Sequence, residues 1–353
     1  YAKITNHDAA TTISGVPSEV VIYKPILLIN EDVVLTKELN PTVFDVCQKQ
    51  GWATISDIVM TRAEAEAVTN IGTAFANVKA DPTWEGGESG WTFDEFMYFT
   101  NVELNSLENR AFANSELRSI SLPSNITSVG DGVFENCSKL ETVQLVEGIT
   151  TIPEKCFLNC AKLVNFRLPD TVEYLMPYSF GGTNMKKIVD NKSPYVEGDK
   201  TIIITENSSL MFIENDAFET EKWSTQTTTN KLSEILLPKK LRLRASSYNF
   251  VLGTYLSKIE IMDIDDTFLS YTNNMLYANR QETSLVRALP KSDGSNVLED
   301  VVAENVTSVY DYAFFNCETV KKIGFGGGLV EYGLGKGVFY NSSVEIVDLS
   351  RCS

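Results

Sequence analysis

The chain contains a single histidine, His7, among its 353 residues. No imidazole follows this position, so the rest of the chain lacks the side chain that Ser-His-Asp and Cys-His catalysis require. It also lacks histidine ligands for zinc. The sequence therefore excludes these nucleophilic mechanisms and every zinc site built on histidine. We predict no catalytic residues, no metal site and no cofactor.

Long apolar segments are also missing. No run approaches the roughly 20 residues that a transmembrane helix needs, so we expect no membrane-spanning segment in this chain. The longest early stretch, from Val20 to Ile29, is interrupted by Lys24 and Pro25 and is typical of a strand. No secretory signal peptide is recognisable, and the start at Tyr1 is consistent with a processed or trimmed chain.

Positive charge is scarce. The chain has 30 lysine and arginine residues against 47 aspartate and glutamate residues, which gives a formal net charge of −17. A field of this sign repels phosphate groups, so we expect neither nucleic acid nor an anionic membrane surface as a partner. Hydrophobic residues make up 43% of the chain and charged residues 22%, values typical of a folded protein rather than a disordered one.

A regular repeat begins at Phe112. Phenylalanine recurs at Phe134, Phe157 and Phe180, at intervals of 22, 23 and 23 residues. A fixed period of this length is typical of a solenoid, in which each repeat buries its apolar face only by stacking on its neighbours. Four further copies, which bring the total to eight, start at Phe218, Phe250, Phe314 and Phe339.

Other positions recur with the phenylalanine. Segments such as Leu140–Leu145 alternate apolar with polar residues, the period of a half-buried strand. Several end in Leu-Pro, as at Leu168-Pro169, where proline withholds a backbone donor and stops the strand. Stacking the copies in register predicts a parallel sheet along one side of the solenoid. An asparagine recurs two residues after the phenylalanine, and we expect its buried amide to bond the turn backbones of adjacent copies. These asparagines are Asn114, Asn136, Asn159, Asn316 and Asn341.

The six cysteines follow the repeat rather than a disulfide framework. Cys137, Cys160 and Cys317 each lie three residues after a repeat phenylalanine, where the first copy has Ser115. A position that accepts cysteine or serine is small and buried, so we interpret these thiols as inert core groups. A disulfide between Cys137 and Cys160 is the alternative, because neighbouring strands lie about 5 Å apart.

Two longer segments interrupt the period, at residues 190–215 and 262–305. Each contains strand-like pieces, Thr201–Thr205 in the first and Asn274–Tyr277 with Leu285–Leu289 in the second, and we expect a hairpin in each. Insertions in solenoids map to loops on one face, often the binding face.

The residues before the array are different, and we assign 1–94 to a leader with a helical cap and 95–353 to the solenoid. Asn40-Pro41 is a helix-start signal, and Gly51 ends that helix. Thr61 and Glu64 form a capping box. We predict a helix over residues 61–76 whose stripe of Val68, Ile71 and Phe75 covers the N-terminal end of the solenoid.

The pattern Phe-x-Asn-Cys-x-x-Leu-x-x-Val/Phe-x-Leu-Pro resembles the leucine-rich repeats of BspA-type bacterial surface proteins. The resemblance covers about residues 95–353, and the segments 60–65 and 93–96 are similar to the leader common before such arrays. It implies an α/β leucine-rich-repeat solenoid of short parallel strands and turns with a small N-terminal helical cap.

The same resemblance implies export, a cell-surface location, often as a lipoprotein, and binding of protein or matrix. It transfers no catalytic residues. Family leaders often carry a calcium-binding-like loop before the helix. Here the stretch from Cys47 to Met60 offers only Asp57, so we do not expect calcium.

The outward positions of the strands form a candidate binding surface, because the neighbours of an inward residue point to the opposite face. Cations at four of these positions put positive charge on one face of an acidic molecule, which favours an acidic or sulfated partner, while two glutamates in the same column reduce that charge. Ordinary solvated strand positions are the alternative reading. The predicted binding residues, flanked by the two inserts, are Asn165, Arg167, Lys187, Glu234, Lys258, Glu260 and Lys322.

Two further motifs are weak. Asp263, Asp265 and Asp266 cluster as cation ligands would, but without a turn glycine a charged loop is the better reading. Residues 326–328 are three glycines that lack the following Lys-Ser/Thr of a phosphate loop, so we interpret them as a flexible turn between repeat elements.

We therefore predict a non-enzymatic, secreted or cell-surface adhesion module that binds a protein, matrix or glycan ligand through the sheet face of the solenoid. One alternative is a glycosidase, which needs only a positioned pair of carboxylates and no histidine. Another is a passive spacer that displays a different domain. A deep cleft with two facing carboxylates would favour the enzyme, and a face without any coherent patch would favour the spacer.

Overall fold

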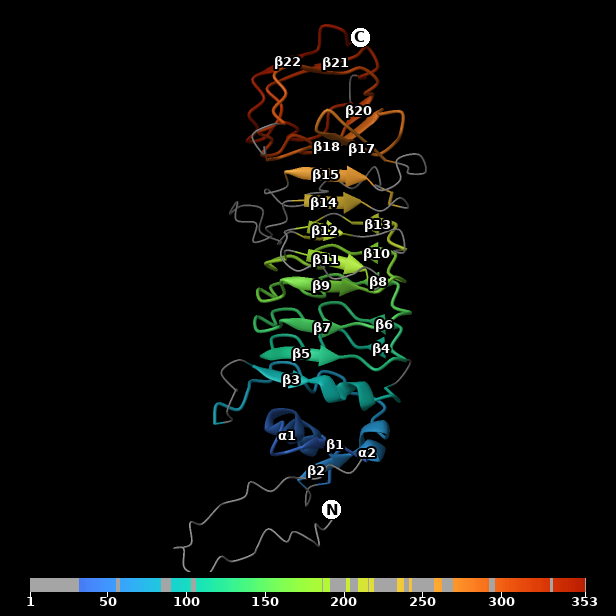
Figure 1. Ribbon diagram of the computed structural model, residues 1–353, viewed down its shortest axis with the longest axis vertical. Helices are drawn as coiled ribbons and strands as arrows, with labels where there is room; N and C mark the ends of the chain where they lie inside the picture. The colour runs from blue at the N-terminus through green and yellow to red at the C-terminus, as the bar shows by residue number, and fades with distance from the viewer. Residues whose placement is uncertain are drawn as a thin grey trace, which may run out of the picture.

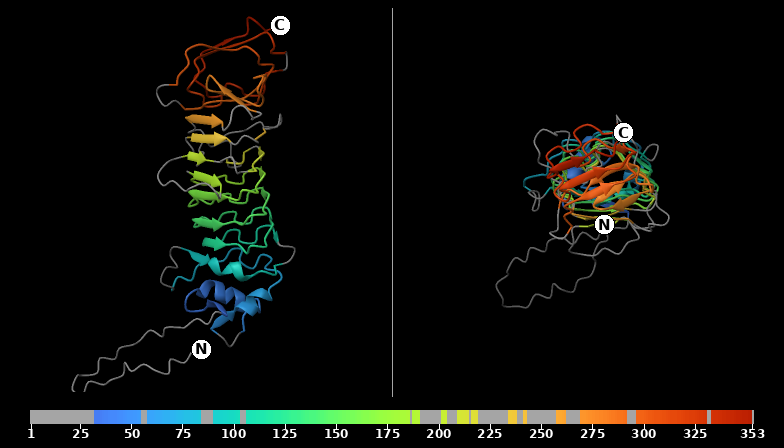
Figure 2. Two further views of the ribbon diagram at one scale, coloured as in Figure 1. Left: turned by 45° about the vertical axis from the view of Figure 1, so that its right-hand side comes forward. Right: turned by 90° about the horizontal axis from the view of Figure 1, so that it is seen from above.

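The protein is a long stack of short strands and turns with a small helical region at its N-terminal end (Figure 1). The computed structural model describes residues 32–54, 58–83, 90–102, 106–185, 187–190, 201–203, 209–214, 216–218, 234–237, 241–242, 257–261, 269–291, 296–330 and 333–352. Each repeat copy makes one turn of the solenoid, which we call a coil. Figure 2 shows, in two further views, how the coils follow one another along the long axis.

The helices are α1 (Pro41–Lys49), α2 (Arg62–Glu66) and the 3₁₀ helix η3 (Asp94–Tyr98). The strands before the first interruption are β1 (Val33–Thr36), β2 (Val59–Thr61), β3 (Trp91–Phe93), β4 (Ser106–Leu107), β5 (Leu117–Ser121), β6 (Ser128–Val129), β7 (Thr142–Gln144), β8 (Thr151–Ile152), β9 (Asn165–Leu168), β10 (Tyr174–Leu175) and β11 (Lys187–Asp190). The remaining strands are β12 (Thr201–Ile203), β13 (Phe212–Ile213), β14 (Glu234–Leu237), β15 (Lys258–Ile261), β16 (Ser270–Thr272), β17 (Met275–Tyr277), β18 (Ser284–Ala288), β19 (Val301–Ala303), β20 (Ser308–Val309), β21 (Lys322–Phe325) and β22 (Ile346–Asp348).

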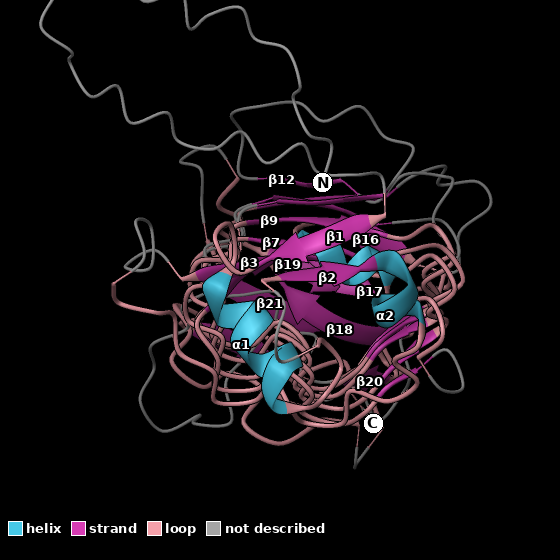
Figure 3. Ribbon diagram, turned by 90° about the horizontal axis from the view of Figure 1, so that it is seen from below, coloured by secondary structure: helices cyan, strands magenta, loops and turns pink. Residues whose placement is uncertain are grey.

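The cap consists of α1, α2 and the antiparallel pair β1–β2, which lie across the N-terminal end of the stack (Figure 3). Helix α1 starts as predicted, with the Asn40 side chain accepting from the backbone N–H of Val43 at 3.4 Å and Pro41 in the first turn. It ends before Gly51, which has a positive φ of 75°. Its buried face is made by Val43, Phe44 and Cys47, so the cap shares the core of the array.

The second predicted helix is much shorter than expected. The capping box between Thr61 and Glu64 is present, but α2 ends at Glu66 instead of extending to residue 76. The Asn70 side chain accepts from the backbone N–H of Gly72 at 2.6 Å, and Gly72 has a φ of 47°. This local bond and the left-handed glycine compete with helix, so the chain turns instead.

Three sheet segments lie along one side of the solenoid. The strand orders are β3-β5-β7, β15-β14-β12-β11-β9 and β19-β21-β22, with every pairing parallel. The register matches the predicted alignment, because Ile120 lies opposite Val143, Ile188 opposite Phe166, and Ile323 opposite Val347. The first segment begins with β3, slightly before the predicted boundary at residue 95.

A second line of parallel pairs follows another edge of the coils. Strand β4 pairs with β6, and β10 pairs with both β8 and β13. Beyond the interruption, β18 pairs with β20, and Val309 forms a bridge with Leu334. These strands, which have two residues each except for the longer β18, bring each coil back toward the next aromatic position.

The first interruption is not the hairpin that the sequence predicts. Strand β12 lies in parallel between β11 and β14, so Thr201–Ile203 adds a strand to the sheet. Strand β13 in the same segment stacks on β10. The repeat template misses β12 because no Phe-x-Asn turn precedes it. Within the expected insert at 190–215, the described strands β12 and β13 therefore continue the solenoid.

The second interruption does contain a hairpin, as predicted. Strand β17 pairs antiparallel with both β16 and β18. Alternate side chains of β17 and β18 belong to two separate hydrophobic clusters. Leu276 and Val286 pack in the cluster that extends from the cap, whereas Met275 and Leu285 pack in the cluster of the last coils. The hairpin is therefore a wall that divides the core of the solenoid into two parts.

A stack of phenylalanine rings runs through the hydrophobic cluster that extends from the cap. Neighbouring rings from Phe112 to Phe180 lie 5.3–5.5 Å apart with interplanar angles of 5–19°. Phe218 continues the stack at 5.7 Å, and Phe75 of the cap begins it at 5.5 Å from Phe112. Each such aromatic contact contributes about 0.5–1.5 kcal/mol beyond the burial of its area. The cap therefore supplies the first ring of the repeat.

The asparagine column is confirmed in position, but its bonding differs from the prediction. The amides bond one another, with Asn136 Nδ2 donating to Asn114 Oδ1 at 2.9 Å and Asn159 Nδ2 donating to Asn136 Oδ1 at 2.8 Å. They are half-buried or exposed rather than buried. All of them have positive φ, between 52° and 62°, and asparagine tolerates this left-handed region better than most residues.

The repeat cysteines occupy the core as free thiols. Cys137 Sγ donates to the carbonyl of Phe112, and Cys160 Sγ donates to that of Phe134, both at 3.1 Å. Burial raises the pKa of the Cys137 thiol to about 11 and that of Cys160 well above its usual value. A thiol that stays protonated is a poor nucleophile, which fits the predicted inert role.

Candidate functional site

The sheet face is the side of the solenoid formed by the outward residues of the three sheet segments. In β7 and β9, Thr142, Gln144, Asn165 and Arg167 are exposed. The residues between them point inward, and Phe166 is only 3% exposed. Alternation of this kind gives each coil two outward side chains on a backbone fixed by its neighbours.

The part of this face nearest the cap is a hydrogen-bonded polar surface. Asp94 Oδ1 accepts from Ser119 Oγ at 3.3 Å and from Ser121 Oγ at 3.5 Å. Ser121 Oγ also lies 3.4 Å from Gln144 Oε1. One hydroxyl proton serves only one acceptor at a time, so these side chains form a shared network rather than independent bonds.

The predicted binding residues fall on two sheet segments. Lys187 lies opposite Asn165, and Glu234 lies opposite Lys258. For Lys187 and Glu234 the structure describes the backbone only. Strand β12, which the sequence alignment does not include, separates them. Lys322 belongs to the segment beyond the hairpin, so it does not share a ladder with the other six residues.

Two of the predicted cations form ion pairs on the face itself. Lys258 Nζ lies 2.6 Å from Glu260 Oε1, and Lys322 Nζ lies 2.8 Å from Asp300 Oδ2. The hydrogen bond and the charge of Asp300 raise the pKa of Lys322. These carboxylates offset the positive charge that the sequence pattern suggests, so the face at β15 and β21 carries paired charges.

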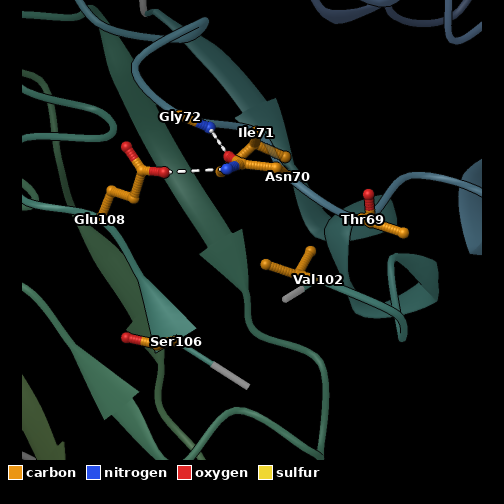
Figure 4. Close-up of a pocket in the computed structure, with 7 residues that line it drawn as sticks. All are labelled: Thr69, Asn70, Ile71, Gly72, Val102, Ser106 and Glu108. Atoms are coloured by element: carbon orange, nitrogen blue, oxygen red, sulfur yellow. Dashed lines mark hydrogen bonds between the residues drawn. The ribbon is translucent and has the colours of Figure 1, made fainter. Parts of the chain in front are cut away.

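Two small hollows open on other surfaces of the described part of the chain. The junction hollow, between the cap and the first coil, has a volume of about 150 Å³ and is lined by Thr69, Asn70, Ile71, Gly72, Val102, Ser106 and Glu108 (Figure 4). The turn hollow has a volume of about 170 Å³ and is lined by Asn109, Arg110, Asp131, Gly132, Glu135, Glu154 and Lys155. Sequence reasoning finds neither hollow. The junction hollow combines cap and coil residues that share no motif, and the turn hollow lies mainly at the two positions that come three and two residues before the repeat phenylalanine, which the repeat pattern does not mark as a site.

The charges of the two hollows are arranged differently. In the turn hollow, Arg110 pairs with Glu135, and Lys155 pairs with Glu154 at 3.4 Å. In the junction hollow, Glu108 Oε1 accepts from Asn70 Nδ2 at 2.9 Å (Figure 4). Among the described residues, no lysine or arginine pairs with Glu108.

The weak motifs contribute no site. The triple glycine is a close approach of two backbones, because a Cβ on Gly326 would lie 2.0 Å from the carbonyl oxygen of Glu304. Asp263, Asp265 and Asp266 lie outside the described residues. Within the ranges that the structure describes, no group of three or more potential metal ligands is found. No helix in the same ranges combines the length and the apolar character of a membrane span.

Comparison with known proteins gives a partial match to a family model and a similar fold. A family model described as the BspA type leucine rich repeat region matches residues 92–196 and 294–353, in six copies. The crystal structure of the pneumococcal vaccine antigen PcpA is similar, with a TM-score of 0.51 and 17% identity over 71% of this chain and 55% of that one.

A leucine-rich cell surface protein from Faecalibacterium prausnitzii is also similar in structure, with a TM-score of 0.48 and 18% identity over 74% of this chain and 65% of that one. The chain thus spans less than two thirds of either structure. A comparison with curated proteins finds no match.

Proposed function

We propose that the protein is a cell-surface binding module without enzymatic activity. The match of residues 92–196 and 294–353 to the BspA-type leucine-rich-repeat model supports this proposal. The ligand of this module is an extracellular protein, matrix component or glycan. The sheet face is the surface that engages it. The residues proposed to contact the ligand are Asn165, Arg167, Lys187, Glu234, Lys258, Glu260 and Lys322.

The observation that carries this proposal is the regularity of the sheet face. Strand pairing in register holds Asn165, Lys187 and their neighbours at spacings of about 4.8 Å per coil. The rigid coils behind them hold the backbone fixed, so little ordering is needed on binding. An extended row of outward side chains suits a long ligand better than a compact one.

The described hollows support a binding role over catalysis. Small-molecule sites are usually clefts of about 300–1,000 Å³ that bury most of the ligand. The junction and turn hollows are about 150 and 170 Å³. In the turn hollow, Glu135 and Glu154 already pair with cations, so they do not form the free carboxylate pair that glycoside hydrolysis needs.

Charge on the sheet face sets the kind of ligand that we propose. Arg167 and Lys187 lie on neighbouring strands, and the rest of the molecule is strongly acidic. An acidic or sulfated ligand would be attracted to this part of the face, with binding that weakens as salt rises. The ion pairs of Lys258 and Lys322 reduce the contribution of these two lysines to the attraction.

The test is an array of glycans and matrix proteins probed with the wild type and with the double variant Lys187→Glu, Lys258→Glu. The matched control is Lys79→Glu, Lys336→Glu, which changes the net charge equally at exposed positions outside the sheet segments. We expect the face variant to lose binding at low salt and the control to retain it. If a ligand binds the face variant as well as the wild type, the sheet face is not the site.

A further inference from the structure

We propose that the junction hollow binds the ammonium group of a lysine side chain presented by a protein partner. The hollow lies between the cap segment 69–72 and the first coil (Figure 4). Its residue Ser106 belongs to β4, which is not part of the three sheet segments that form the sheet face. It is therefore a second docking point, and it does not depend on the ligand that the sheet face takes.

The carboxylate in this hollow is oriented before any ligand arrives. Asn70 Nδ2 donates to Glu108 Oε1 at 2.9 Å, and Asn70 Oδ1 accepts from the backbone N–H of Gly72 at 2.6 Å. The Asn70 amide is thus fixed at both ends, and it holds the Glu108 side chain across the hollow. Oε2 of Glu108 remains as an acceptor for a cation.

The junction hollow differs from the turn hollow in that its carboxylate, Glu108, forms no ion pair with a described lysine or arginine. Glu135 and Glu154 in the turn hollow are each paired with a basic side chain of the protein itself. Within the described ranges, Glu108 has no such partner. The net charge of −17 also draws cationic groups toward the surface and speeds their encounter. The charge of this site therefore suits a cation from a partner.

The other walls favour lysine over arginine. A guanidinium group binds best when both carboxylate oxygens accept from it, but Glu108 Oε1 already accepts from Asn70. A compact ammonium needs only Oε2, and the hydroxyls of Thr69 and Ser106 offer further acceptors. Ile71 and Val102 form the apolar part of the lining, which matches the methylene stem of lysine.

The experiment is an NMR titration of the whole chain with Nα-acetyl-lysine methylamide, followed at the amide resonance of Gly72. We expect saturable shifts with a dissociation constant on the order of millimolar, because a single small contact gives weak binding. The Nε-acetylated probe lacks the charge and should not shift this resonance. The arginine analogue should bind more weakly than the lysine probe.

The key variant is Glu108→Gln, which keeps an oxygen for Asn70 but removes the charge. We expect it to weaken binding of the lysine probe about fivefold, the upper range for an exposed ion pair. Glu135→Gln makes the same charge change in the turn hollow and should bind like the wild type. Unchanged binding by Glu108→Gln, or equal binding of the acetylated or arginine probe, would overturn the proposal.

Discussion

The two parts of the solenoid, before and after the wall formed by β16–β18, use the same repeat with different regularity. In the first part the phenylalanines recur every 22 or 23 residues from Phe112 to Phe180, and their rings stack with interplanar angles below 20°. In the second part Phe314 and Phe339 are 25 residues apart, and their rings are tilted by 35°. The longer repeat thus leaves the coil intact and tilts the rings, whose centroids still lie 5.1 Å apart.

The comparison also shows what a neighbouring coil contributes. Val143 and Ile323 have coils on both sides and are at most 5% exposed. Val347 holds the equivalent position in the last described coil and is 37% exposed. The same side chain position is therefore apolar core or exposed surface depending on whether another coil covers it, as expected for a solenoid in which each repeat contacts only its neighbours.

The largest effect that we expect comes from truncating one ring in each part. Phe134→Ala and Phe314→Ala each remove a fully buried side chain and should each destabilise the protein by about 3–5 kcal/mol. Because the wall separates the two clusters, each loss should act on its own side. Hydrogen exchange followed by mass spectrometry should show lower protection in coils 112–185 for the first variant and in 296–352 for the second.

A uniform loss of protection across both parts, in either variant, would mean that the solenoid unfolds as one cooperative unit. In that case the wall of β17 and β18 transmits stability rather than dividing it. Phe315→Ala serves as the control, because its ring is only half-buried and lies outside the central stack.

A smaller effect should come from the asparagine column, and it should differ between the two parts. Asn136 both donates to Asn114 and accepts from Asn159, whereas Asn341 donates to Asn316 at 2.6 Å. Asn136→Ala loses two amide bonds and places alanine at a φ of 61°, which should cost about 1–3 kcal/mol. Asn341→Ala should cost less, as measured by denaturant unfolding.

Asn136→Gly separates the two causes, because glycine accepts the left-handed backbone without penalty. If backbone conformation dominates, Asn136→Gly should recover a large part of the stability that Asn136→Ala loses. If glycine and alanine are equally destabilising, the amide ladder is the main contribution.

The sequence predicts the repeated features well and the unique ones poorly. The alignment of Ile188 with Phe166, the end of the strand at Leu168 and the place of Asn136 in a column of asparagines all follow from a pattern that recurs in several coils. Each copy must satisfy the same packing requirement, so a misleading residue in one copy does not change the prediction. Phe75 is missed as the first ring of the stack because a helical stripe and a repeat turn bury the same apolar residues.

Features that depend on a single contact across distant residues are not visible in the sequence. The pairing of Lys322 with Asp300 reduces the positive charge predicted for the sheet face. The two residues are one repeat of 22 residues apart, but Asp300 lies in the segment 262–305, which the sequence predicts to be an insert, so the alignment omits it. Glu108 and Asn70 meet only because α2 ends early and the chain turns at Gly72. The candidate sites were therefore less predictable than the fold, since they rest on side-chain pairs that occur once.

The smallest effect on stability is expected for the exposed ion pairs, one in each part. Lys258→Ala and Lys322→Ala should leave the midpoint of denaturant unfolding unchanged within error, because exposed pairs contribute little once side-chain entropy and solvent screening are counted. Any effect on ligand binding would then report recognition rather than folding. If Lys258→Ala weakens binding and Lys322→Ala does not, the ligand is confined to the sheet segment β9–β15, before the wall. Equal losses would instead require a ligand that spans the wall, since the two lysines lie on separate sheet segments. A marked fall in stability for either variant would contradict the view that these pairs are surface features. It would assign a structural role to the pair within strand β15 for Lys258, or to the pair between neighbouring coils for Lys322.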